Sequence, residues 1–86
     1  MSELNSHDIE QQLKKTIGKA SEIRVAFDGS KAHIIVVLAA FSTMGRLEKQ
    51  QLIYSALADE IADGRIHAVT METLTPEEWV KVRPFR

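Results

Sequence analysis

The chain has 86 residues, of which 44% are hydrophobic and 27% are charged, with a formal net charge of −1 and no cysteine. This length suits a single domain, residues 1–86, and the near-neutral charge excludes a global basic field for nucleic-acid phosphates. The absence of cysteine excludes disulfides and all-cysteine metal sites. No apolar run approaches the roughly 20 residues of a membrane span, and the N-terminus lacks the apolar region of a signal peptide. We therefore expect a cytoplasmic protein with no membrane partner.

The first predicted element is an amphipathic helix of about three turns. Its apolar residues recur at helical spacing: Ile9, Leu13 and Ile17. Asn5 or Ser6 is suited to cap the start of this helix, and Gly18 is a natural place for it to end.

A β-hairpin is predicted to follow. Residues 23–28 alternate between apolar and polar types, which is the period of a half-buried strand. Asp28-Gly29-Ser30 is a turn signal, because glycine takes a positive φ without a steric penalty. The continuous, mostly β-branched run of residues 33–38 predicts a central strand that is covered at least partly on both faces.

A long amphipathic helix is predicted after an irregular connection at residues 41–45. Five residues place an apolar stripe on one face of this helix: Leu47, Tyr54, Leu57, Ala58 and Ile61. Five others are mostly directed away from that face: Glu48, Lys49, Ser55, Asp59 and Glu60. Asp63-Gly64 ends the helix, and residues 66–71 form the third predicted strand.

The last predicted helix begins with a clear set of signals. Thr75 is suited as the N-cap, Pro76 falls at the first helical position, and Glu78 completes a capping box. The helix is expected to run to roughly Arg83.

His67 lies within the short apolar run 65–69, where a strand would normally have valine or isoleucine. Trp79, the only tryptophan, is expected to be fixed just inside the last helix. A fixed histidine beside a fixed aromatic residue indicates a small site on a rigid frame. The simpler alternative is a strand histidine that packs and hydrogen-bonds near Trp79.

The elements follow the order α-β-β-α-β-α and indicate an α/β (α+β) domain of two layers. A helical crossover brings the third strand into a three-stranded mixed sheet, with helices on one face. We expect one core between the sheet and the helices, formed by Ile17, Val25, Phe27, Val36, Leu57, Ile61 and Val69.

No enzymatic activity is predicted. The sequence has no Ser/His/Asp spacing of a catalytic triad and no phosphate-binding glycine loop. Asp59, Glu60 and Asp63 form a cluster of carboxylates near the end of the long helix. A solvated polar surface is the simpler interpretation of this cluster.

The motifs from the hairpin turn to the last helix resemble the BolA family, and Gln50-Gln51 with the Asp-Gly-Ser turn is similar to its IbaG-type branch. The most specific part is Ile66-His67-Ala68-Val69 combined with Thr75-Pro76-Glu77-Glu78-Trp79. The resemblance covers about residues 9–83. It implies a fold similar to the type II KH domain and no enzymatic activity. It also implies a monothiol glutaredoxin as partner and, with glutathione, a shared two-iron, two-sulfur cluster used in iron trafficking, iron sensing or stress regulation.

The same resemblance implies that His67 is a cluster ligand, since neutral imidazole can ligate iron, as in Rieske centres. The family's second ligand, in the loop between the first two strands, falls on Lys31. A lysine ammonium has no free lone pair near pH 7. His33 is a weak candidate for this role, because the loop would have to be remodelled. The residues predicted to contact the partner protein are Arg65, Trp79 and Lys81.

The alternative function is that of a KH-like transcriptional regulator that binds DNA or RNA. KH domains clamp nucleotides with a Gly-x-x-Gly loop, but residues 43–46 contain a single glycine. Basic side chains can still form a local patch for phosphates. The candidates are Arg46, Lys49 and Arg83.

Overall fold

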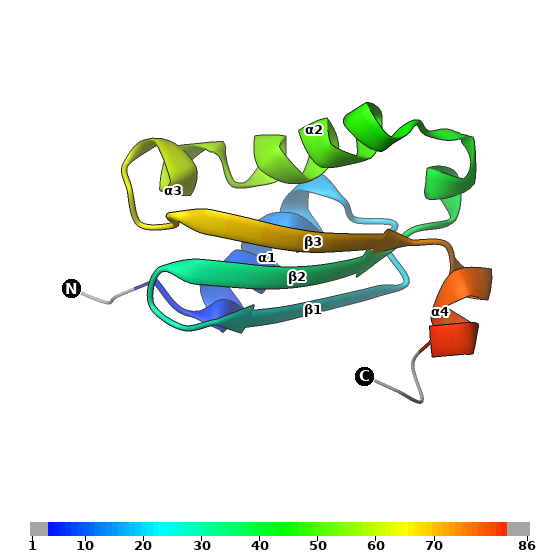
Figure 1. Cartoon of the computed structure of the whole chain (residues 1–86), viewed down its shortest axis with the longest axis horizontal. Coiled ribbons are helices and arrows are strands. Elements are labelled where there is room, and N and C mark those ends of the chain that lie inside the picture. The colour runs from blue at the N-terminus through cyan, green and yellow to red at the C-terminus, as the bar shows by residue number, and fades with distance from the viewer. Residues whose placement is uncertain (1–3, 83–86) are drawn as a thin grey trace.

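A three-stranded mixed sheet forms one layer of the computed structural model, which describes residues 4–82. The edge strand β1 (Glu22–Phe27) pairs antiparallel with the central strand β2 (Lys31–Val37), and β2 pairs in parallel with β3 (Ala68–Leu74). The α+β class, the hairpin and the helical connection to a parallel third strand are therefore confirmed (Figure 1).

Three helices pack against the sheet to form the main core. In Figure 1, α1 (Ser6–Thr16) lies behind the sheet, and α2 (Arg46–Ala56) and α3 (Ala58–Ala62) run alongside β3. A short 3₁₀ helix, η1 (Ala39–Thr43), replaces part of the irregular connection that we predicted. Among residues 4–82, no helix combines the length and the apolarity that a membrane crossing requires.

The predicted core is confirmed, because all seven expected residues belong to one apolar cluster. The buried members are Ile17, Val36 and Leu57. The partly buried members that pack against them are Val25, Phe27, Ile61 and Val69. Alternate residues of each strand point to this cluster, as the two-residue period of a strand requires.

The first helix begins at a capping box. Asn5 is the N-cap, and its side-chain oxygen accepts a hydrogen bond from the amide of Asp8 at 2.9 Å. The Asp8 carboxylate accepts one in return from the Asn5 amide at 3.3 Å. Ile9 and Leu13 are fully buried on the face of the helix that meets the sheet.

The long helix is broken at Leu57, and its buried face differs from the predicted one. Leu47 and Tyr54 are 65% and 43% exposed, whereas Glu60 is only 6% exposed. The buried stripe consists of Ile53, Ala56, Leu57 and Glu60. Residues at helical spacing form two overlapping stripes in this segment. We predicted that the stripe with more apolar residues would be the buried one. Ala58, also assigned to the apolar face, is exposed as well. The expectations that Leu47, Tyr54 and Ala58 face the core and that Glu60 is solvated were therefore wrong.

The third strand begins and ends later than predicted. The amides of His67 and Ala68 both approach the carbonyl oxygen of Ser30, at 2.7 and 3.4 Å, so the ladder with β2 begins only at Ala68. Ile66 is buried in the main core and does not belong to the strand. The expectation that His67 lies inside a strand was therefore wrong.

The last helix, α4 (Pro76–Val82), has the predicted capping box. The amide of Thr75 donates to Oε1 of Glu78 at 2.8 Å, and the amide of Glu78 donates to Oγ1 of Thr75 at 3.3 Å. The Thr75 amide stabilises the charged carboxylate and so holds the pKa of Glu78 below its ordinary value.

Trp79 of α4 packs on the opposite face of the sheet from the main core. It is 7% exposed and forms a second apolar cluster with Ile35 and Val37 of β2. The second half of β2 is apolar on both faces, and α4 covers this end of the second face. The expectation that all helices lie on one face was therefore wrong for α4.

Candidate functional site

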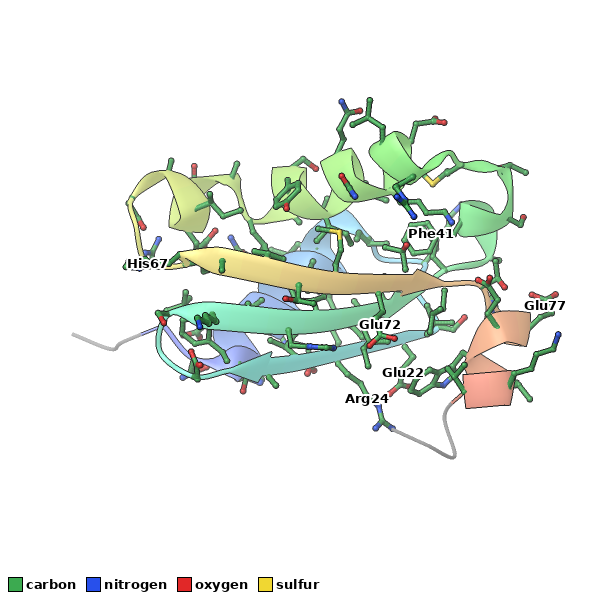
Figure 2. The ribbon with its side chains drawn as sticks, in the orientation of Figure 1. Glu22, Arg24, Phe41, His67, Glu72 and Glu77 are labelled. Atoms are coloured by element: carbon green, nitrogen blue, oxygen red, sulfur yellow. The ribbon has the colours of Figure 1, made fainter. Side chains whose placement is uncertain are left out.

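His67 is an exposed residue at the end of the sheet, directly before β3. Figure 2 shows it at the end of β3 that lies away from α4. Its backbone N–H donates to the carbonyl oxygen of Ser30 at 2.7 Å, so the main chain is tied to the turn between β1 and β2. The imidazole is therefore accessible from outside while its backbone is held in place.

The turn that holds His67 is itself fixed by an aspartate. Oδ1 of Asp28 accepts hydrogen bonds from the amides of Ser30 at 3.1 Å and Lys31 at 2.8 Å. Gly29 has a φ of 102°, which glycine adopts without strain. The amide of Lys31, followed by that of Ser30, stabilises the carboxylate and lowers the pKa of Asp28.

The structure brings the two predicted ligand positions together. Lys31 is exposed at the start of β2 and lies in register with Ala68, the residue after His67. Because a lysine ammonium offers no lone pair, His67 is the one of these two positions whose side chain is able to ligate iron.

Arg65 lies two residues before His67 and contacts its own loop. Its Nε donates to Oδ2 of Asp63 at 2.7 Å, and its backbone N–H donates to Oδ1 of the same residue at 3.0 Å. The guanidinium also lies 3.9 Å from Oε2 of Glu60. The Arg65 side chain is 49% exposed, so one side of the guanidinium remains open to solvent.

His33, the weak candidate, lies in β2 on the face of the sheet that does not meet the main core. Its Nε2 is 3.1 Å from Oε2 of Glu72 on β3. Ligation of iron by this nitrogen would require that contact to break. The position of His33 within a paired strand also leaves little freedom for the loop remodelling that the role would need.

Trp79 and Lys81 lie on α4, at the opposite end of the sheet from His67 (Figures 1 and 2). The seven residues of β3 separate the two ends by roughly 20 Å. The expectation of a histidine beside this tryptophan was therefore wrong. The Arg24 guanidinium lies 5.2 Å from the centre of the Trp79 ring, a contact that no sequence pattern indicated.

Two of the three basic residues of the alternative function lie at the start of α2. Arg46 is exposed at the first position of the helix, and Nζ of Lys49 is 5.9 Å from the centre of the Phe41 ring. Glu48 lies between them and accepts a hydrogen bond from the amide of Gly45 at 3.0 Å. Arg83, the third predicted member, lies outside the described residues.

Within residues 4–82, no three or more histidine, aspartate or glutamate side chains gather in a way that could hold a metal ion. Imidazole is a suitable donor for iron, but His67 would supply a single ligand. A cluster ligated by His67 would therefore need its remaining ligands from another molecule.

Comparisons with known proteins agree with this architecture. The family model described as BolA-like protein matches residues 3–78. Acid stress protein IbaG of Escherichia coli K12 is 38% identical over 80 residues, which cover 93% of this chain and 94% of that protein. The DNA-binding transcriptional regulator BolA of Haemophilus influenzae is 31% identical over 80 residues, covering 83% and 77% of the two chains. The crystal structure of a bol-like protein from Babesia bovis superposes with a TM-score of 0.77 at 28% identity, covering 95% and 96%.

Proposed function

This chain belongs to the BolA-like protein family, and we propose that it is a non-enzymatic adaptor of the cytoplasm. In this proposal it binds a monothiol glutaredoxin and, with glutathione, shares a two-iron, two-sulfur cluster with it. The names of the two relatives, a stress protein and a transcriptional regulator, denote no enzymatic reaction.

The observation that carries the proposal is the placement of His67. The imidazole is exposed, while its backbone amide is held by Ser30 at 2.7 Å. A ligand that completes the coordination of a cluster on another protein must reach outward and keep its position as the two proteins dock. His67 meets both requirements.

The neighbouring turn supports the same role. Lys31 lies beside the His67 segment and carries a positive charge next to the site. Thiolate-ligated clusters are held by negatively charged sulfur, so a nearby ammonium can contribute electrostatic attraction without a metal bond. In this proposal the thiolates belong to the glutaredoxin and to glutathione.

The test is to mix the protein with a cluster-loaded monothiol glutaredoxin and record the visible circular dichroism spectrum together with size-exclusion elution. Co-elution with a changed spectrum supports the shared cluster. Co-elution with an unchanged spectrum would retain the partner and refute the cluster. Separate elution with an unchanged spectrum would refute both.

The second candidate function is regulation by binding DNA. It is favoured by the exposed Arg46 at the start of α2 and by the name of the H. influenzae relative. Binding through such residues would weaken steeply as salt rises, since phosphate contacts release counterions. A fluorescence anisotropy titration against duplex DNA at two salt concentrations, with Arg46→Ala as the comparison, distinguishes this function from the adaptor.

A further inference from the structure

Glu60 is the one polar or charged residue among the buried side chains of residues 4–82, at 6% exposure. It lies on α3, seven residues before His67, on the face that meets α1. Its Oε2 accepts a hydrogen bond from Nε2 of Gln12 at 3.3 Å. Its Oε1 is buried without a hydrogen-bond partner.

Two contacts of Glu60 are made with the segment that carries His67. Its backbone carbonyl oxygen accepts the amide of Ile66 at 3.1 Å. Its carboxylate lies 3.9 Å from the guanidinium of Arg65. With Gln12 on the other side, Glu60 therefore connects α1 to the two residues that precede His67.

A buried Glu60 carboxylate with an unpartnered oxygen lowers the stability of the fold relative to an apolar side chain at the same position. A buried carboxylate with one unsatisfied oxygen loses its hydration without full compensation, and an apolar residue of similar size would avoid that loss. Leucine would extend the stripe of Ile53, Ala56 and Leu57 without interruption. A contribution to the geometry of the neighbouring loop accounts for a carboxylate at this position.

We propose that Glu60 is a positioning residue for His67, acting through Gln12 and Arg65 to hold the segment 63–67 against α1. The consequence for a shared cluster rests on the function proposed above. The positioning itself is a property of the free protein and can be measured without a partner.

The test compares Glu60→Leu with wild type by amide hydrogen exchange, observed by NMR, and by urea unfolding. Ile66 and His67 report on the loop, because both amides are hydrogen-bonded, and β2 reports on the whole fold. We expect exchange at Ile66 and His67 to be about tenfold faster, with exchange in β2 unchanged or slower. Asp59→Leu is the matched control, since it removes an exposed carboxylate from the same helix.

Two further variants make the result specific. Glu60→Gln keeps an oxygen that can accept from Gln12, so it should restore most of the protection at Ile66 and His67. Should Glu60→Leu fail to fold, Gln12→Leu removes the same hydrogen bond from the side of α1. Its amide exchange at Ile66 and His67 is then compared with its exchange in β2. Unchanged exchange at Ile66 and His67, or an equal acceleration in β2, would overturn the proposal.

The cluster provides the second readout. In the mixture with cluster-loaded glutaredoxin, Glu60→Leu should alter the visible spectrum while Asp59→Leu leaves it as in wild type. An identical spectrum for wild type and Glu60→Leu would overturn the consequence for the cluster. If wild type itself forms no shared cluster, the proposed function fails, and the exchange measurement still decides whether Glu60 positions the loop.

Discussion

The amide of His67 donates to the carbonyl oxygen of Ser30 at 2.7 Å, and this bond joins two segments that are far apart in the sequence. It holds an exposed histidine beside the turn that leads into β2. The bond does not depend on the side chain of His67 or Ser30, so the exposed side chains of His67 and the neighbouring Lys31 can be replaced while this bond remains. The first two predictions use this property.

The first prediction concerns His67→Ala. Because the imidazole is exposed, its loss should leave the midpoint of urea unfolding nearly unchanged. The visible spectrum of the mixture with cluster-loaded glutaredoxin should disappear or change shape. His33→Ala is the control, and it should leave that spectrum as in wild type. Loss of the fold in His67→Ala would show that the residue is structural and that its assignment as a ligand is wrong.

The second prediction concerns Lys31→His. An imidazole offers iron a lone pair at neutral pH, which an ammonium does not, and position 31 lies beside the His67 segment. The variant should therefore retain the shared cluster longer when a chelator is added. Lys31→Gln serves as the control for removal of the charge alone. Equal rates of cluster loss in wild type, Lys31→His and Lys31→Gln would show that a side chain at position 31 cannot reach a cluster ligated by His67.

The third prediction tests the core through two leucines of the same helical segment. Leu57 is fully buried, and Leu57→Ala should lower the free energy of unfolding by about 2–5 kcal/mol. Leu47 is 65% exposed, and Leu47→Ala should change it by less than about 0.5 kcal/mol. Urea unfolding of both variants measures the difference. Similar losses in the two would mean that the stripe containing Leu57 does not face the core.

The fourth prediction concerns the cap of α4. Thr75→Ala removes the oxygen that accepts the amide of Glu78, and it should destabilise the protein by roughly 1 kcal/mol. Thermal unfolding followed by far-UV circular dichroism measures the change. Thr75→Ser, which keeps the oxygen, should stay close to wild type. An unchanged melting temperature in Thr75→Ala would indicate that Trp79 packing sets the start of the helix.

The fifth prediction concerns acid. The pKa of Asp28 is lowered in the folded state by the amides of Lys31 and Ser30, so its carboxylate stabilises the fold above the ordinary aspartate pKa of about 3.9. That contribution is lost as the pH falls through the lower, folded pKa. Asp28→Asn should therefore lower the melting temperature at pH 7 more than at pH 2–3. An equal difference at both pH values would show that the charge of Asp28 does not hold the turn.

Local structure was predictable where neighbouring residues decide it. The caps at Asn5 and Thr75 depend on a side chain and an amide three residues away. Thr75 was predicted as a cap, and Asn5 was one of two candidates, of which Ser6 instead begins the helix. The turn at Asp28 likewise depends on glycine and on two nearby amides. The burial of Glu60 carried a signal too, because it continues the spacing of Ile53, Ala56 and Leu57. A second, more apolar stripe that includes Leu47 and Tyr54 has the same helical spacing. Which of the two faces is buried depends on the contacts that the helix makes with the sheet and α1.

The main helices and strands, their order and the residues able to ligate or cap follow from short-range periodicity and side-chain chemistry, so the amino-acid sequence was enough to predict them. Which of these residues come into contact depends on how the helices and strands pack in three dimensions. An extended strand carries the chain away from its starting point, so His67 and Trp79 lie at opposite ends of β3 although they are close in sequence. The parallel pairing of β2 with β3 brings His67 to Ser30 and Lys31, because the register of two distant strands is set by the core they share and not by either strand alone.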